Sequence, residues 1–492
     1  MVTPRASGIA FAIVLFAAPL ARAQTDRDPP DPVAEADPED AVASPEAAAR
    51  SVLEDEPEDV VPEWMTPTPG GLTAEQAARL AAETAPAVRG AEAQRTAARA
   101  QADVAASAFA PQVTITGSYN RINEVDLPPF EFGGMAFDNP FPQILDLWAL
   151  RGEIQIPVSD YFLTVWPSYE GADGFARAAG HQVEVQRQDA AFRAREAFYN
   201  HVRALAGRWV AEQAVESLDA TLRDVESLQE AGVGSRADVA QVRAQRASAR
   251  AMVVQAQGQV RVTERLLRRL LHLPRGARIE VGEDLFGVEV GAPPSEDALL
   301  EQAMAERSEV LAVRTLVEAR ESMVRARLGS VFPHVAIIGQ IETSSPNQRI
   351  IPQTTDFFTT WVVGAAVSWS PNDVAVGVHR IREAEAQVSE AREDLEQLED
   401  GLAIEVAQAV AAHQAAAESI AAAREGLEAA DTALSDRRAM LTAGMATTTE
   451  VMQAQLEHTR ARLELLNAYV DLHVARAQID RIAGRAAPDA SE

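Results

Sequence analysis

Histidine and carboxylate side chains are the groups in this sequence that could do chemistry, because its 492 residues include no cysteine. The eight histidines are scattered, and none are spaced as His-x-x-x-His or His-Glu-x-x-His, the helical patterns that bind zinc. His458 and His473 share one helical segment, where we expect them to be exposed or interfacial rather than metal ligands. No Gly-x-Ser-x-Gly elbow, P-loop or dinucleotide fingerprint occurs. The sequence therefore predicts no catalytic residue, no metal site and no cofactor, and we do not expect an enzyme.

Acidic residues dominate the charge of the chain. There are 73 Asp and Glu residues against 44 basic ones, all of them arginine, for a formal net charge of −29. We expect most of the acids on solvated helix faces, often three or four residues from an arginine. Such a chain lacks the positive surface that phosphate binding needs, which excludes nucleic acid as a partner.

The first 23 residues have the pattern of a secretory signal peptide. Arg5 supplies a positive start, residues 9–18 are apolar, and Ala-Arg-Ala at 21–23 is a cleavage site before Gln24. The alternative is a buried N-terminal helix. No later apolar span is long enough for a transmembrane helix. We therefore expect export to the periplasm, the medium or an outer membrane.

An acidic, proline-rich leader is expected over residues 24–70. It cannot bury enough apolar surface to offset its ordering entropy, so we expect it to be disordered. The alternative is an acidic tether for a cationic partner.

The remainder is a duplication. Segments that start at Leu72 and at Pro294 align without a gap, and each runs into a proline, Pro111 or Pro333, that opens an alternating segment. We expect a first repeat over 72–290, a second over 294–484 and a short tail over 485–492.

In each repeat we expect a helix, two strands, a long helix, a turn and a final helix, in this order. The sequence favours mainly α structure, because aromatic residues are only 5% and alanine is abundant. Apolar residues recur every seven positions in the long helices, which is typical of left-handed coiled coils. The two shorter helices of a repeat together match the long helix in length, so we expect one continuous rod beside one rod of two stacked halves. The expected helices are 73–109, 165–230 and 235–273, then 296–329, 376–442 and 447–483.

The strands alternate apolar and polar residues over about ten positions, as transmembrane β-barrel strands do. Trp361, Val363 and Val367 lie on one face of the last strand, and Leu150, Ile154, Ile156 and Val158 do so in an earlier one. A soluble, half-buried sheet would give the same alternation. Four strands cannot close a barrel in lipid, so several chains would have to share one; three chains would supply twelve strands.

The region from Leu72 to Gly484 resembles the TolC-like outer membrane efflux protein family. The resemblance is carried by the Leu-Thr-x-Glu-Gln-Ala start, the paired helix ends before proline, and the stretches 231–239 and 443–451. It implies a homotrimer in outer membrane lipid, with a shared twelve-stranded β-barrel and an α-barrel tunnel that extends into the periplasm. It also implies a periplasmic adaptor (membrane fusion) protein and an inner-membrane pump of RND or ABC type as partners.

The resemblance further implies that two turns between helices form the periplasmic tip, which contacts the adaptor and narrows the entrance. Glu450 matches one of two acids at the family's constriction, and Gln453 replaces the other. Leu441 and Ala446 stand where members often have the Tyr and Arg of a closing network. The alternative is that Asp238 and Glu450 are ordinary helix N-terminal acids. The expected tip and gate residues are Gly232, Gly234, Ser235, Arg236, Asp238, Gly444, Thr447, Glu450 and Gln453.

The expected function is the outer membrane channel of a tripartite efflux system, a passive exit duct for substrates of the pump. Type I protein secretion and metal-ion export are alternatives within the same class. A periplasmic coiled-coil scaffold without a pore is a more distant alternative.

Overall fold

The computed structural model describes residues 68–485, apart from 126–129, 133–134, 138–142, 275, 278 and 289. The expected signal peptide, almost all of the expected leader and the tail after residue 485 lie outside the described residues.

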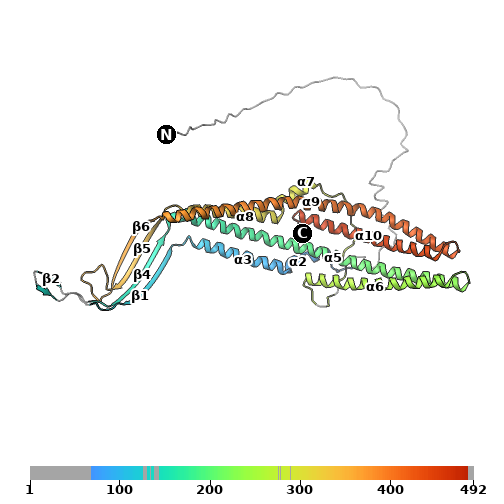
Figure 1. Cartoon of the computed structure of the whole chain (residues 1–492), viewed down its shortest axis with the longest axis horizontal. Helices are drawn as coiled ribbons and strands as arrows, with labels where there is room; N and C mark the ends of the chain where they lie inside the picture. Colours follow the sequence, from blue (N-terminus) through green and yellow to red (C-terminus); the bar gives the residue numbers. More distant parts are fainter. Residues whose placement is uncertain are drawn as a thin grey trace, which may run out of the picture. The chain divides into compact units, whose positions relative to one another are not determined.

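Two series of elements follow one another in the same order, and Figure 1 shows them by colour. The first series is α2 Ala74–Thr84, α3 Pro86–Ser107, β1 Gln112–Arg121, β4 Asp146–Ile156, α5 Trp166–Glu230 and α6 Arg236–Leu270. The second series is α7 Glu296–Glu306, α8 Ser308–Gly329, β5 His334–Ser345, β6 Phe358–Ser368, α9 Pro371–Thr442 and α10 Thr448–Ile482. The first series also has a small hairpin, β2 Phe130–Phe132 with β3 Met135–Phe137, and a short helix α4 Val158–Asp160 that leads through a π-helical turn, Tyr161–Val165, into α5.

The long helices confirm the prediction from heptad periodicity. α5 has 65 residues and α9 has 72, and in each the only proline stands in the first turn, where its missing amide costs no helical hydrogen bond. That same preference starts α9 at Pro371, five residues before the expected start. None of the described helices is both long and apolar enough to cross a membrane.

The four helices of the two long hairpins form a row. α6 packs on α5, α5 packs on α10, and α10 packs on α9, so α6 and α9 lie at the two ends of the row. We also expected a rod of two stacked halves beside each long helix. The first series has this arrangement, because α2 and α3 pack along the earlier part of α5 and α6 packs along the rest.

The expected first helix of each series is broken, and this corrects the prediction. The break lies at Ala85 in the first series and at Arg307 in the second, both with extended backbone (φ −60°, ψ 134° and φ −67°, ψ 127°). Pro86 explains the first break, because the residue before proline disfavours the helical conformation. No proline follows Arg307.

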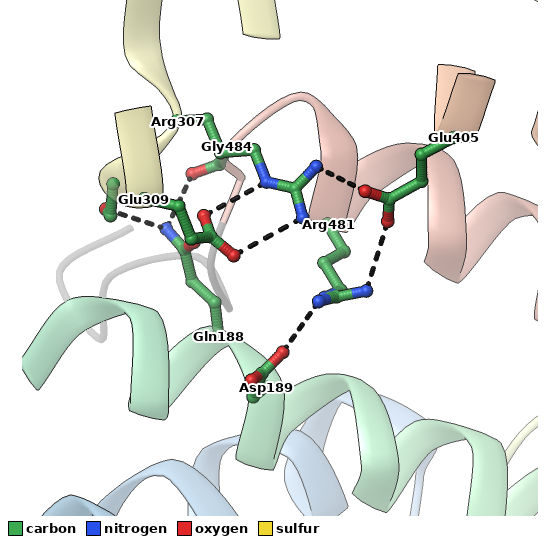
Figure 2. A network of polar contacts seen from close by, with 8 residues as sticks. Gln188, Asp189, Arg307, Glu309, Glu405, Arg481 and Gly484 are labelled. Atoms are coloured by element: carbon green, nitrogen blue, oxygen red, sulfur yellow. Dashed lines mark hydrogen bonds and ion pairs between the residues drawn. The ribbon is translucent and has the colours of Figure 1, made fainter. Parts of the chain in front are cut away.

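Arg307 is instead buried, and an ionic network holds its guanidinium (Figure 2). Its guanidinium donates to Glu405 on α9 at 2.6 Å and to Glu309 on α8 at 3.0 Å. Arg481 on α10 donates to the other oxygen of Glu405 at 3.2 Å and pairs with Asp189 on α5 at 2.8 Å. The ion pairs therefore connect the residue at the break to α8 and α9 directly, and to α10 and α5 through Glu405 and Arg481.

The four long strands form one antiparallel sheet in the order β1-β4-β5-β6. β4 ends at Ile156, and Val158, which was expected in the strand, begins α4 because Pro157 removes a ladder donor. The register places Ile115 opposite Gly152, Ile154 opposite Gly339, and Ile341 opposite Trp361, so the apolar residues of the four strands share one face. β1 and β6 are the two edges of this sheet.

Candidate functional site in the two interhelical turns

The turn between α5 and α6 reverses the chain in a few residues. Gly232 has φ +79°, the left-handed conformation that glycine adopts without steric cost, and ends α5. The amides of Val233 and Gly234 both donate to the carbonyl of Leu228, at 3.0 and 2.9 Å. These bonds satisfy the last turn of α5 and set the direction in which α6 starts.

α6 begins with a capping box. The Asp238 amide donates to Ser235 Oγ at 3.1 Å, and the Asp238 carboxylate accepts from the Ser235 amide at 3.1 Å and from its hydroxyl at 2.7 Å. Both helix-terminal donors are satisfied reciprocally, and the negative charge lies at the positive end of the helix dipole.

The turn between α9 and α10 has the same construction. Gly444 has φ +70°, and the amides of Met445 and Ala446 donate to the carbonyl of Met440 at 2.8 and 3.2 Å. The Glu450 carboxylate accepts from the Thr447 amide at 2.7 Å and from its hydroxyl at 2.9 Å.

The two acids differ in their charged neighbours. The hydrogen bonds from Thr447, together with the Arg437 guanidinium at 3.5 Å, lower the pKa of Glu450 below its usual value of 4.5. Asp238 has no cationic partner within the described residues, and Arg236, two residues before it, has no acidic one there. The Glu450 carboxylate therefore stays ionised to lower pH than an ordinary glutamate.

All nine residues were expected at the tip. Eight of them lie in the two turns or in the first helical turn that follows, whereas Gln453 lies exposed in the second turn of α10. Sequence reasoning did not identify the capping boxes, although the signal was present as an acid three residues after Ser235 and after Thr447. It also missed Arg437, which no spacing rule linked to Glu450.

A shared core and a polar contact join the two hairpins behind the turns. Leu218 and Leu222 of α5, Leu441 of α9 and Val451 of α10 belong to one buried cluster. Leu441 is thus a core residue. It is the residue that, by the resemblance, stands in place of the Tyr of the closing network.

Arg438 of α9 provides that polar contact. It donates to Gln455 of α10 at 2.9 Å and also contacts the Ser217 hydroxyl of α5. Burial lowers the pKa of this guanidinium, yet its contacts join three helices close to the turns.

Each turn also presents an apolar side chain to solvent. Val233 and Met445 occupy equivalent positions and are each 74% exposed. Neither was singled out from the sequence. Large apolar side chains at equivalent exposed positions mark a surface that another molecule could cover.

The two histidines noted in the sequence lie buried at helix interfaces. His458 Nε2 is 3.4 Å from Asp431 of α9, and His473 Nε2 is 3.0 Å from the Leu285 carbonyl. Burial lowers the pKa of both. Within the described part of the chain, no three His, Asp or Glu side chains are grouped so that they could hold a metal ion.

The sequence profile of the family described as Outer membrane efflux protein matches residues 77–272 and 299–485. The chain belongs to this family. It is therefore an outer membrane protein of a family of efflux channels rather than enzymes. Outer membrane efflux protein BepC of Brucella suis biovar 1 (strain 1330) is 25% identical over 397 residues, which are 78% of this chain and 79% of that protein.

Solved channel structures share the fold. CusC matches with a TM-score of 0.71 and 17% identity, over 87% of this chain and 98% of CusC. The MtrE outer membrane channel of Neisseria gonorrhoeae, in its open state, matches with a TM-score of 0.69 and 16% identity, over 84% of this chain and 88% of MtrE. The described part of the chain, mostly helical with a four-stranded sheet, thus has the fold of outer membrane channels.

Proposed function

We propose that three copies of this chain form the exit duct of a tripartite efflux system, a passive channel from a periplasmic adaptor and an inner-membrane pump to the outside of the cell. The observation that carries the proposal is the sheet. One face of it is apolar along all four strands, and each edge strand has an unused row of hydrogen-bonding groups.

The two faces of the sheet differ as a membrane wall requires. Ile115, Trp361 and Val367 on the apolar face are each about 70% exposed. The opposite face carries Arg151, which pairs with Glu342 at 2.8 Å. A water-soluble rod would leave the whole apolar face in water, which argues against the scaffold alternative.

Edge pairing sets the number of chains. Open edges cannot face hydrocarbon, since each unpaired amide or carbonyl there costs several kcal/mol. Three four-stranded sheets joined edge to edge close a twelve-stranded barrel. The long helices then continue from the barrel as a tunnel through the periplasm, and their far turns are its entrance.

The entrance function is proposed for the two turns described above. Threefold symmetry places three Glu450 carboxylates, and three from Asp238, around this end of the tunnel. Rings of carboxylates attract cations and repel anions. The exposed Val233 and Met445 side chains are suited to contact the adaptor.

Assembly tests the proposal. The purified mature protein in detergent is expected to be a trimer by light scattering and by chemical cross-linking, and to fractionate with the outer membrane. A stable, folded monomer would contradict it, because a single sheet cannot close.

The entrance is tested by charge reversal. Asp238→Lys and Glu450→Lys are expected to leave the trimer intact, because the turns bury little apolar area, and to change single-channel conductance or efflux. Unchanged current and unchanged efflux in both variants would contradict an entrance role for these acids.

A further inference from the structure

The two end helices of the four-helix row carry opposite charge. α6 has eight arginines and two acids, whereas α9 has fifteen acids and six arginines. In a chain with a net charge of −29, one strongly basic helix needs an explanation. Helix propensity gives none, because Arg and Glu are equally good helix formers.

Most of the arginines on α6 have no acidic partner in the described part of the protomer. Arg243, Arg246 and Arg268 make ion pairs with acids of α5 or α6. The other five are all exposed, and no acid contacts them within the described residues: Arg236, Arg250, Arg261, Arg265 and Arg269.

Three acids in the later part of α9 also have no cationic partner in the described part of the protomer. Glu418, Glu425 and Glu428 are exposed and have no cationic partner among the residues described. Unpaired charges of opposite sign thus lie on helices at opposite ends of the same row.

Both helices have a second face of small residues, turned away from the protomer. Ala247 and Ala251 of α6 are exposed, and each lies about 160° around the helix from buried Ala249. On α9, exposed Ala422 lies in the same way relative to buried Ile420, and exposed Ala415 lies seven residues earlier on the same face. Small residues allow two helices to approach closely, and the charges flank that contact.

The charges also match in height above the turns. At 1.5 Å per residue, Arg250 and Glu428 each lie about 21 Å along their helices from the turn end. Arg261 lies about 37 Å and Glu418 about 36 Å from the same end. Copies related by rotation about an axis parallel to the helices have their residues at the same heights. Arg250 of one copy therefore lies level with Glu428 of the next, and Arg261 with Glu418.

We propose that α6 of one copy packs against α9 of the next copy, with the basic and acidic faces opposed. This interface is head-to-tail, and head-to-tail contacts close into a ring when the rotation is right. The inference rests on the proposed trimer, whose closed ring of helices already requires α6 of one copy beside α9 of the next. It adds the charge pairing that selects this contact. Opposite charge favours α6 on α9, and like charge disfavours α9 on α9 or α6 on α6.

A charge swap in the full-length mature chain tests the pairing. Arg250→Glu with Arg261→Glu is expected to raise the protein concentration needed for half-assembly at low salt about tenfold or more, because like charges then face each other in all three interfaces. Glu418→Arg with Glu428→Arg is expected to do the same. All four changes together restore assembly. Glu457→Arg, on an exposed site of α10 inside the row, is the matched control and is expected to have no effect.

Disulfide cross-linking gives an independent readout, since the chain has no native cysteine. Ala244 and Ala433 lie about 12 and 14 Å from the turn ends of α6 and α9. A chain with both Ala244→Cys and Ala433→Cys is expected to form covalent dimers and trimers on oxidation, and either single variant alone is not.

The outcomes separate the two proposals. If neither charge reversal changes the protein concentration needed for half-assembly, or if Ala244→Cys alone cross-links, the α6–α9 charge pairing is wrong and the proposed duct is unaffected. A monomeric wild-type protein would overturn both.

Discussion

Ala85 and Arg307 occupy equivalent places in the two halves of the chain, and both interrupt a helix with the same extended backbone. In the first half the cause is local, because Pro86 follows. In the second half Ser308 follows, and the break coincides with a buried arginine whose ion pairs reach α8 and α9 (Figure 2). The same geometry is thus encoded once by a covalent restriction and once by tertiary contacts.

The two interhelical turns also have the same backbone construction with different residues. Gly234 of the first turn corresponds to Ala446 of the second. A Cβ on Gly234 would come within 2.9 Å of the Gln229 nitrogen, so the second turn must make room for its alanine. The Ala446 amide lies 3.2 Å from its acceptor, against 2.9 Å for Gly234, whereas the Met445 amide lies closer to the same acceptor than the Val233 amide does, at 2.8 against 3.0 Å.

The largest effect is expected from Arg307→Ala. Removal of a buried cation leaves Glu309 and part of Glu405 without their partner, at a cost of about 2–3 kcal/mol in the free energy of unfolding. Arg481 remains on Glu405, which limits the loss. Chemical denaturation of the detergent-solubilised protein measures it.

Arg392→Ala is the matched control for that experiment. Arg392 pairs with Glu321 but its side chain is 62% exposed, so the expected cost is below about 0.5 kcal/mol. Equal losses in the two variants would mean that the ionic network of Arg307 does not hold the second break.

Gly232→Ala and Gly444→Ala are expected to cost about 1 kcal/mol each, because an L side chain is strained at positive φ. A Cβ at either position meets nothing within 4 Å, so the cost is one of backbone conformation alone. Thermal unfolding of the two variants checks this. A clear difference between them would show that the turns are not equivalent.

Ser308→Pro gives the second half a proline at the position that Pro86 occupies in the first half. Arg307 already has the backbone that precedes proline, and proline suits the first position of α8. The expected change in the free energy of unfolding is within about 1 kcal/mol. Glu318→Pro, in the middle of α8, should cost about 3 kcal/mol or more as its control. A large loss from Ser308→Pro would refute the equivalence of the two breaks.

Periodicity and proline position were enough to predict the long helices, the four strands and the location of the turns. Seven-residue repeats and period-two alternation are local signals, and α5, α9 and the strands obey them. Pro86 was equally visible but was passed over inside a strong helical pattern. The break at Arg307 could not be predicted, because its partners Glu405 and Arg481 lie far away in sequence. The Arg437–Glu450 contact was hidden for the same reason, since α9 and α10 must first fold together.

The most direct test of the account is the current through the reconstituted protein. The trimer in a planar bilayer is expected to conduct steadily and, across a salt gradient, to show a reversal potential of cation preference that Glu450→Gln reduces. The hydrogen bonds from Thr447 lower the pKa of Glu450, so its charge is present above that pKa and is lost as pH falls through it; the preference should weaken only at a pH below the usual range of glutamate. A protein that does not conduct would contradict the account at its centre, and anion preference would contradict the acidic entrance.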